Sequence, residues 1–185
     1  AGMVRLFAGG FAIGDLVGVC FAVLICPALT YLYIGYTTAT ARSSPRFVIG
    51  HAALLVSFVF ALSSLSLPLG FSAATAVAAY LSMLAARRRD PLAAGVLALL
   101  FGFAAVPAAS PGTAVAALLF SMLCAHIPVW LAAAAGVVGF AALCFLAGGT
   151  ALLFSVLPEF LIGTALSFLP LGAAGEKLLP FTGRR

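Results

Sequence analysis

The chain has 185 residues, of which 65% are hydrophobic and only 7% are charged. Because a typical soluble domain carries about 25% charged residues, this composition excludes an ordinary water-soluble surface. The net charge of +5 comes from a few basic residues in short gaps between apolar runs. Such gaps favour a chain that lies in a lipid bilayer and argue against a nucleic-acid partner.

The apolar runs predict membrane-spanning helices rather than the strands of a barrel. Segments 97–103 and 132–140 are apolar on every side, whereas barrel strands alternate apolar and polar residues. A helix crosses the bilayer with about 20 apolar residues, so segment 11–172 has room for six or seven crossings. We therefore expect an all-α polytopic helical bundle, flanked by a short N-terminal segment, 1–10, and a basic tail, 173–185.

The first predicted crossing covers residues 11–33. It ends beside Tyr31, Tyr33 and Tyr36, and aromatic residues of this kind favour the headgroup level of a bilayer. A polar loop over residues 37–46 is expected to follow.

The next apolar stretch, 47–86, is too long for one crossing and predicts two. They are expected to turn at residues 67–70, where Pro68 and Gly70 interrupt a helix. The stretch ends at the three arginines of segment 87–89, which cannot lie in hydrocarbon. Pro91 then suits the first turn of a new helix.

From residue 92 to residue 172 the chain carries one charge, Glu159, so helix boundaries must be inferred from helix-breaking residues. Segments 107–112 and 148–150 have the proline and glycine content of turns. Segment 126–130 contains His126 and Trp130 and is typical of a membrane interface. These three breaks together predict seven crossings.

The distribution of basic residues favours seven crossings with an external N-terminus, in an inner or plasma membrane. The basic residues that then face the cytoplasm are Arg42, Arg46, Arg87, Arg88, Arg89, Lys177, Arg184 and Arg185. Only Arg5 is left outside. If segment 107–112 is instead a kink within one long helix, there are six crossings and the basic tail lies outside.

Asp15 and Glu159 are the acidic residues within the predicted crossings, and they are the first candidates for a substrate or proton pathway. A carboxylate in the bilayer is costly and requires a partner, a cavity or protonation. Pro158 and Gly163 flank Glu159, as in the broken helices that line transport cavities. The alternatives are that Asp15 lies at the outer interface and that Glu159 caps a turn.

Four cysteines lie in apolar stretches and form no CxxC pair, so packing is their simplest role. They are Cys20, Cys26, Cys124 and Cys144. His51 and His126 fall in different predicted crossings and are candidates for haem ligation, with an interfacial position as the alternative for both. No cofactor is required by any motif, and no hydrolase or nucleotide-binding motif indicates an enzyme.

Small residues recur at helical spacing in two predicted crossings and allow close approach of neighbouring helices. They are Gly95, Ala98 and Gly102 in one segment, and Gly136, Gly139 and Ala142 in another. This pattern predicts tight helix packing.

Segment 26–35 resembles the first helix of the cytochrome c biogenesis and DsbD-type transmembrane thiol electron carriers. Segment 102–112 is similar to their fourth helix, and segment 162–166 to their C-terminal pattern. In that family a cysteine beside proline on each of two helices forms an electron-relaying disulfide. The resemblance implies Cys20 or Cys26 as the first of these, while Gly112 stands where the second is expected.

The leading functional hypothesis is movement of a small solute or ion through the bundle, coupled to protons through Glu159. One alternative is a structural or cofactor-holding subunit of a larger membrane complex, with partner membrane subunits or copies of itself. The other alternative is the thiol electron carrier that the resemblance implies.

Overall fold

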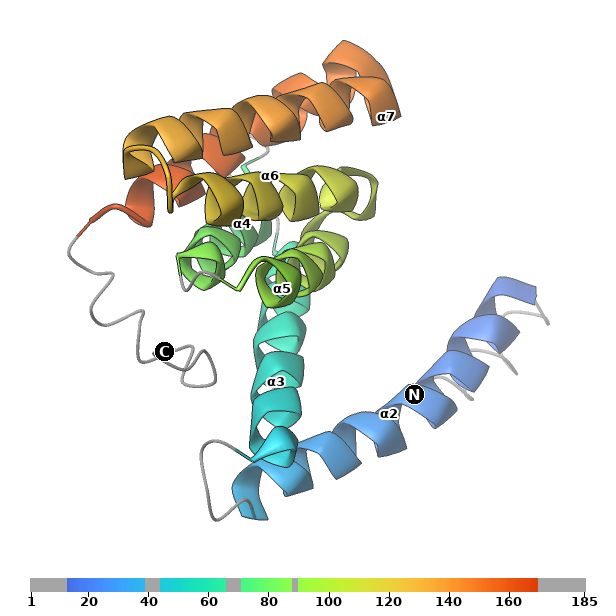
Figure 1. Cartoon of the computed structure of the whole chain (residues 1–185). Helices are drawn as coiled ribbons and strands as arrows, with labels where there is room; N and C mark the ends of the chain where they lie inside the picture. Colours follow the sequence, from blue (N-terminus) through green and yellow to red (C-terminus); the bar gives the residue numbers. More distant parts are fainter. Residues whose placement is uncertain (1–12, 39–43, 66–70, 88–89, 170–185) are drawn as a thin grey trace. The chain divides into compact units, whose positions relative to one another are not determined.

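The computed structural model describes residues 13–38, 44–65, 71–87 and 90–169, with side chains from residue 26 onward (Figure 1). Within these ranges the chain is helical, and no strand occurs. The helices are α2 (Ile13–Thr38), α3 (Pro45–Ser63), α4 (Ala73–Ala86), α5 (Pro91–Ala105), the short 3-10 helix η2 (Pro107–Ala109), α6 (Ser110–Leu123) and α7 (Val129–Leu166).

The chain divides into two compact units, Ala1–Ala53 and Leu54–Arg185. Unit 1 contains α2 and the beginning of α3, and unit 2 contains the remaining helices.

In unit 1, α2 extends to Thr38, beyond the end predicted at residue 33, and α3 begins at Pro45. Thr37 and Thr38, which were expected in the polar loop, thus belong to α2, and Pro45 and Arg46 belong to α3. The hydroxyls of Thr37 and Thr38 both donate to the Ile34 carbonyl, at 3.1 and 2.7 Å. Because these bonds satisfy the hydroxyls locally, two polar residues can occupy the last turn of an apolar helix.

The beginnings of α4 and α5 follow from local capping. Ser72 precedes α4 and its hydroxyl accepts a hydrogen bond from the Thr75 backbone N–H. Asp90 precedes α5, its carboxylate accepts from the Ala93 N–H at 3.2 Å, and Pro91 occupies the first turn. These caps satisfy N–H groups that have no partner within the helix. The turn predicted at residues 67–70 lies outside the described residues.

α5 and α6 are separate antiparallel helices joined through η2, not one kinked helix. The Thr113 hydroxyl on α6 donates to the Ala98 carbonyl on α5 at 2.8 Å, and Gly102 faces Ser110 and Thr113. Residues nearer the end of α5 thus meet residues nearer the beginning of α6. The break predicted at residues 107–112 is confirmed, although α6 already begins at Ser110.

α7 folds back on itself at Gly148 and Gly149, which confirms the turn predicted there. Gly149 has a φ of 64° and a ψ of −158°, a backbone conformation that is essentially restricted to glycine. The rings of Phe140 and Phe160 stack with centroids 3.8 Å apart, on opposite sides of the turn. α7 is therefore a helical hairpin, with a first arm over residues 129–147 and a second arm over residues 150–166.

The helices of unit 2 pack in a defined order. The first arm runs against α6, where Gly136 faces the Ala116 carbonyl. The second arm runs parallel to α4, since Gly163 faces Ala76 while Glu159 meets Ser72. α4, α6 and the second arm consequently run in one direction, and α5 and the first arm in the other (Figure 1).

Among the described residues of unit 2, the charged side chains other than Glu159 lie at one end, here called the charged end. Arg87 at the end of α4 lies over the ring of Phe168, which follows the second arm, with 4.8 Å to the ring centroid. Asp90 begins α5 at this end, and His126 lies in the turn between α6 and α7. The opposite end, with the Gly148–Gly149 turn, carries no charged residue in the part of the chain that is described.

The interior of unit 2 is built from small residues and a few large ones. The large side chains that are completely buried include Met83, Phe101, Phe120, Phe140 and Phe160. Many large apolar side chains face outward instead, among them Leu146 at 78% exposure and Phe154 at 72%. So much exposed apolar surface requires an apolar environment or a partner.

Two of the described helices, α3 and α7, are long and apolar enough to cross a membrane. α4, α5 and the η2–α6 segment are apolar but shorter. Counting the two arms of α7 separately and leaving out η2, the described residues form seven α-helical segments. That all seven cross a membrane stays a prediction.

Candidate functional site at Glu159

Glu159 lies in the middle of the second arm of α7 and is only 4% exposed. Its Oε1 atom accepts a hydrogen bond of 2.7 Å from the backbone N–H of Ser72. Beside it, the Thr75 hydroxyl donates a hydrogen bond of 3.1 Å to the Ser72 hydroxyl. The acidic side chain therefore ends at the beginning of α4, in contact with polar groups rather than hydrocarbon.

This contact completes the N-terminal cap of α4. In a capping box, the third residue of the helix is a glutamate or glutamine that accepts from the N–H of the capping residue. In α4 the third residue is Thr75, whose backbone N–H donates a hydrogen bond to the Ser72 hydroxyl. Thr75 has no carboxylate or amide to accept from the Ser72 N–H. Glu159, 87 residues away in sequence, supplies the acceptor for the Ser72 N–H. A negative charge here also interacts favourably with the positive end of the helix dipole.

The beginning of α4 lies deep within unit 2. Because α4 and the second arm run parallel, with Ser72 beside Glu159 and Ala76 beside Gly163, Ser72 lies at the level of Glu159 rather than at the end of the bundle. Nine residues of the second arm precede Glu159, which corresponds to about 13 Å at a rise of 1.5 Å per residue. The cap therefore lies near mid-depth between the two ends.

Gly163 sets the distance between these helices. A Cβ atom at this position would overlap the Ala76 carbonyl and lie 2.8 Å from the Ala79 Cβ. Because Gly163 has no side chain, the second arm can lie close to α4. This close packing places Glu159, one turn before Gly163, within hydrogen-bond distance of Ser72. The helix at Pro158 is also weakened, because proline has no N–H to offer the Phe154 carbonyl.

Asp15 and Cys20 lie within α2, but their side chains lie outside the described part of the structure. The functional predictions for these two residues therefore remain predictions. Cys26, the other candidate first cysteine of the thiol carriers, is free and exposed on α2.

Cys124 and Cys144 are also free. Cys124 follows α6, whereas the Cys144 sulfur lies beside Gly112, near the beginning of α6. Along α6, Cys124 follows Gly112 by twelve residues, which corresponds to about 18 Å. Because bonded cysteines have Cα atoms less than about 7 Å apart, this pair cannot form a disulfide.

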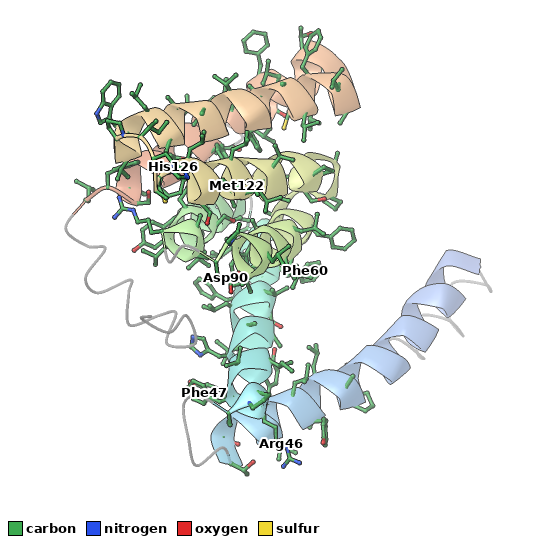
Figure 2. All side chains as sticks on the ribbon, viewed as in Figure 1. Arg46, Phe47, Phe60, Asp90, Met122 and His126 are labelled. Atoms are coloured by element: carbon green, nitrogen blue, oxygen red, sulfur yellow. The ribbon has the colours of Figure 1, made fainter. Side chains whose placement is uncertain are left out.

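His51 and His126 fall in different units. The His51 ring stacks on Phe47 with centroids 5.8 Å apart and lies 5.5 Å from the Tyr36 ring, whereas His126 is exposed between α6 and α7 (Figure 2). Within the described residues, no three His, Cys, Asp or Glu side chains lie close enough together to hold a metal ion. Haem ligation by the two histidines stays a prediction.

Sequence reasoning missed Ser72 and Thr75. A serine three residues before a threonine, directly after a glycine and proline turn, is a usable signal for a helix beginning. No local signal connects these residues to Glu159, because their contact depends on how two distant helices pack.

No family model, curated protein or solved structure matches this chain. The resemblance to the thiol electron carriers therefore remains a prediction.

Proposed function

We propose that this chain is an integral membrane protein that moves a small solute or ion, with Glu159 coupling the movement to protons. Its seven helical segments would each enter the bilayer. The outward-facing apolar side chains, such as Leu146 and Phe154, support a lipid environment. So does the collection of charged residues at one end of unit 2, since both ends of a membrane bundle meet water but its sides do not.

The packing of unit 2 supports one cytoplasmic end for this unit. The Arg87 side chain contacts Phe168, so the end of α4 and the residues that directly follow α7 belong to the same end of unit 2. The positive-inside rule assigns that end to the cytoplasm. An external N-terminus then follows from seven crossings.

The observation that carries the transport proposal is the hydrogen bond between Glu159 and the Ser72 N–H at mid-depth. Transporters place discontinuous helices near the middle of the bilayer, with helix ends facing their sites. α4 is such a short helix, and Glu159 occupies its N-terminal end. Protonation removes the charge that favours this contact, which frees the end of α4 to move.

Glu159→Gln in proteoliposomes tests this mechanism. An enclosed pH dye reports proton entry while sodium, potassium, chloride and small neutral solutes are offered in turn. The wild-type chain should acidify the lumen with at least one of them, and Glu159→Gln should abolish acidification because glutamine cannot titrate. Wild-type acidification in the variant, or no flux above that of empty liposomes with the wild type, would overturn the proposal.

A second candidate is a structural subunit of a larger membrane assembly. The favouring observation is the same contact, because a carboxyl group that caps α4 within the chain already has a structural role. This candidate requires that Glu159→Gln alter stability without altering any flux. It also requires that the chain purify with a partner protein in a fixed ratio.

A further inference from the structure

Unit 1 contains a pocket of about 190 Å³ on one side of the α2–α3 hairpin. Its lining includes Tyr31, Ile34 and Thr38 on α2, which share one helix face, and Arg46 and Ile49 on α3. Figure 2 shows Arg46 and its neighbour Phe47 pointing to different sides of the hairpin. The pocket therefore lies on a different side of the hairpin from the packed rings of Tyr36, Phe47 and His51.

The polarity of the pocket changes along the hairpin. Thr38 and Arg46 lie near the connection between the helices, where the hairpin is polar. Ile34 and Ile49 lie about one turn farther along and are 55% and 53% exposed. One end of the pocket thus offers a cation, and the next turn offers open apolar walls.

Arg46 has no acidic partner within unit 1. The sequence of this unit contains one acidic residue, Asp15, which lies 23 residues before Thr38. That separation corresponds to about 34 Å along a helix. The Thr38 hydroxyl already donates to the Ile34 carbonyl, so the Arg46 guanidinium is the main donor of the pocket.

We propose that this pocket binds an anionic phospholipid, with the phosphate on Arg46 and the beginning of an acyl chain over Ile34 and Ile49. Guanidinium groups bind phosphate oxygens through paired, charge-assisted hydrogen bonds. A free phosphate would leave the apolar walls exposed, and a second copy of the chain would bring another positively charged surface to Arg46. The proposal rests on the membrane location proposed above.

Tyr31 supports this placement. It is strongly exposed and lines the pocket beyond Ile34. Tyrosine rings favour the boundary between headgroups and acyl chains, where a polar hydroxyl meets water or glycerol groups. The order of residues along the pocket thus matches the polarity of a phospholipid. Arg46 is suited to the phosphate, and the two isoleucines and the Tyr31 ring are suited to the beginning of an acyl chain.

Native mass spectrometry of the full chain in a mild detergent tests the site. The protein is mixed with equal amounts of dioleoyl phosphatidylglycerol and dioleoyl phosphatidylcholine, and bound lipid is counted per chain. The wild type should retain one phosphatidylglycerol in preference to phosphatidylcholine. Arg46→Gln should reduce its retention by about tenfold, the effect of losing one charged hydrogen-bonding group.

Two further variants separate the pocket from general surface charge. Arg87→Gln removes the same charge in unit 2 and should retain the lipid as the wild type does. Ile49→Trp keeps Arg46 but fills the pocket, and should also release the lipid. Circular dichroism checks that each variant remains helical, and Ile49→Trp provides the test if Arg46→Gln does not fold.

Three results would overturn the proposal: equal retention of the two lipids by the wild type, equal loss in Arg46→Gln and Arg87→Gln, or a dimer whose formation excludes lipid and is abolished by Ile49→Trp. Failure of the membrane location itself is distinguishable, because the chain would then leave membranes at alkaline pH and remain soluble without detergent.

Discussion

Phe140 and Phe160 stack almost parallel, 7° between ring planes, although they lie on opposite arms of the α7 hairpin. Both rings are completely buried in the core of unit 2. The pair joins the first arm, which packs on α6, to the second arm, which packs on α4. It is therefore one of the contacts that hold the two arms, and through them α6 and α4, together.

Phe160→Ala should destabilise unit 2 by about 3 kcal/mol, because it removes a large side chain from a packed interior and leaves a cavity. The measurement is SDS-induced unfolding of the chain in mixed micelles, followed by circular dichroism. Phe154→Ala is the matched control on the same arm. Because its ring faces outward, its removal should lower the free energy of unfolding by less than about 1 kcal/mol. Equal effects of the two substitutions would contradict the hairpin packing.

Gly149→Ala should destabilise the α7 turn by about 1 kcal/mol, because an L-residue with a side chain is disfavoured at a φ of 64°. No atom lies within 4 Å of a Cβ at this position, so the cost comes from backbone conformation and not from a clash. Gly149→Asn should lose about as much, since asparagine tolerates a φ of about 60° only with a ψ of about 45°, whereas ψ is −158° here. Wild-type unfolding midpoints for both variants would show that Gly149 does not hold this conformation.

The sequence predicts the helix breaks of unit 2 because those signals are local. Pro107 and the Gly148–Gly149 pair interrupt helices wherever they occur, and both breaks appear as predicted. The end of α2 was predicted too early, because hydropathy does not register that Thr37 and Thr38 satisfy their hydroxyls on Ile34.

The candidate site could be predicted only in part. A buried acid beside Pro158 identifies Glu159 from sequence alone. Its partner at Ser72 depends on the register between α4 and the second arm, which the close approach at Gly163 sets. Such a register is a property of packing between distant segments, and no local pattern encodes it.

Topology is testable by cysteine labelling in a cysteine-free chain. Arg88→Cys and Leu169→Cys should both react with an impermeant maleimide only from the cytoplasmic side, because Arg87 contacts Phe168 and the arginines follow the positive-inside rule. Val138→Cys, on the outward-facing apolar surface in the middle of the first arm, is the unreactive control. Labelling of positions 88 and 169 from opposite sides would contradict the helix order, and labelling of both from outside would reverse the orientation.

Glu159→Leu and Glu159→Gln should differ in stability because only glutamine can accept a hydrogen bond from the Ser72 N–H. Leucine fills the space but accepts no hydrogen bond, which leaves a buried donor unsatisfied at a cost of about 2 kcal/mol. Glutamine still presents an oxygen to Ser72 and loses only the interaction of a charge with the beginning of α4, about 1 kcal/mol or less.

Unfolding in mixed micelles measures both, with Ser155→Ala as the control, since its exposed hydroxyl donates only to the Leu152 carbonyl one turn earlier. Hydrogen exchange at the amide of Ser72 gives a local readout and should accelerate in Glu159→Leu but not in Ser155→Ala. If Glu159→Leu unfolds at the wild-type midpoint with unchanged exchange at Ser72, Glu159 does not cap α4, and the mid-depth site loses its structural basis.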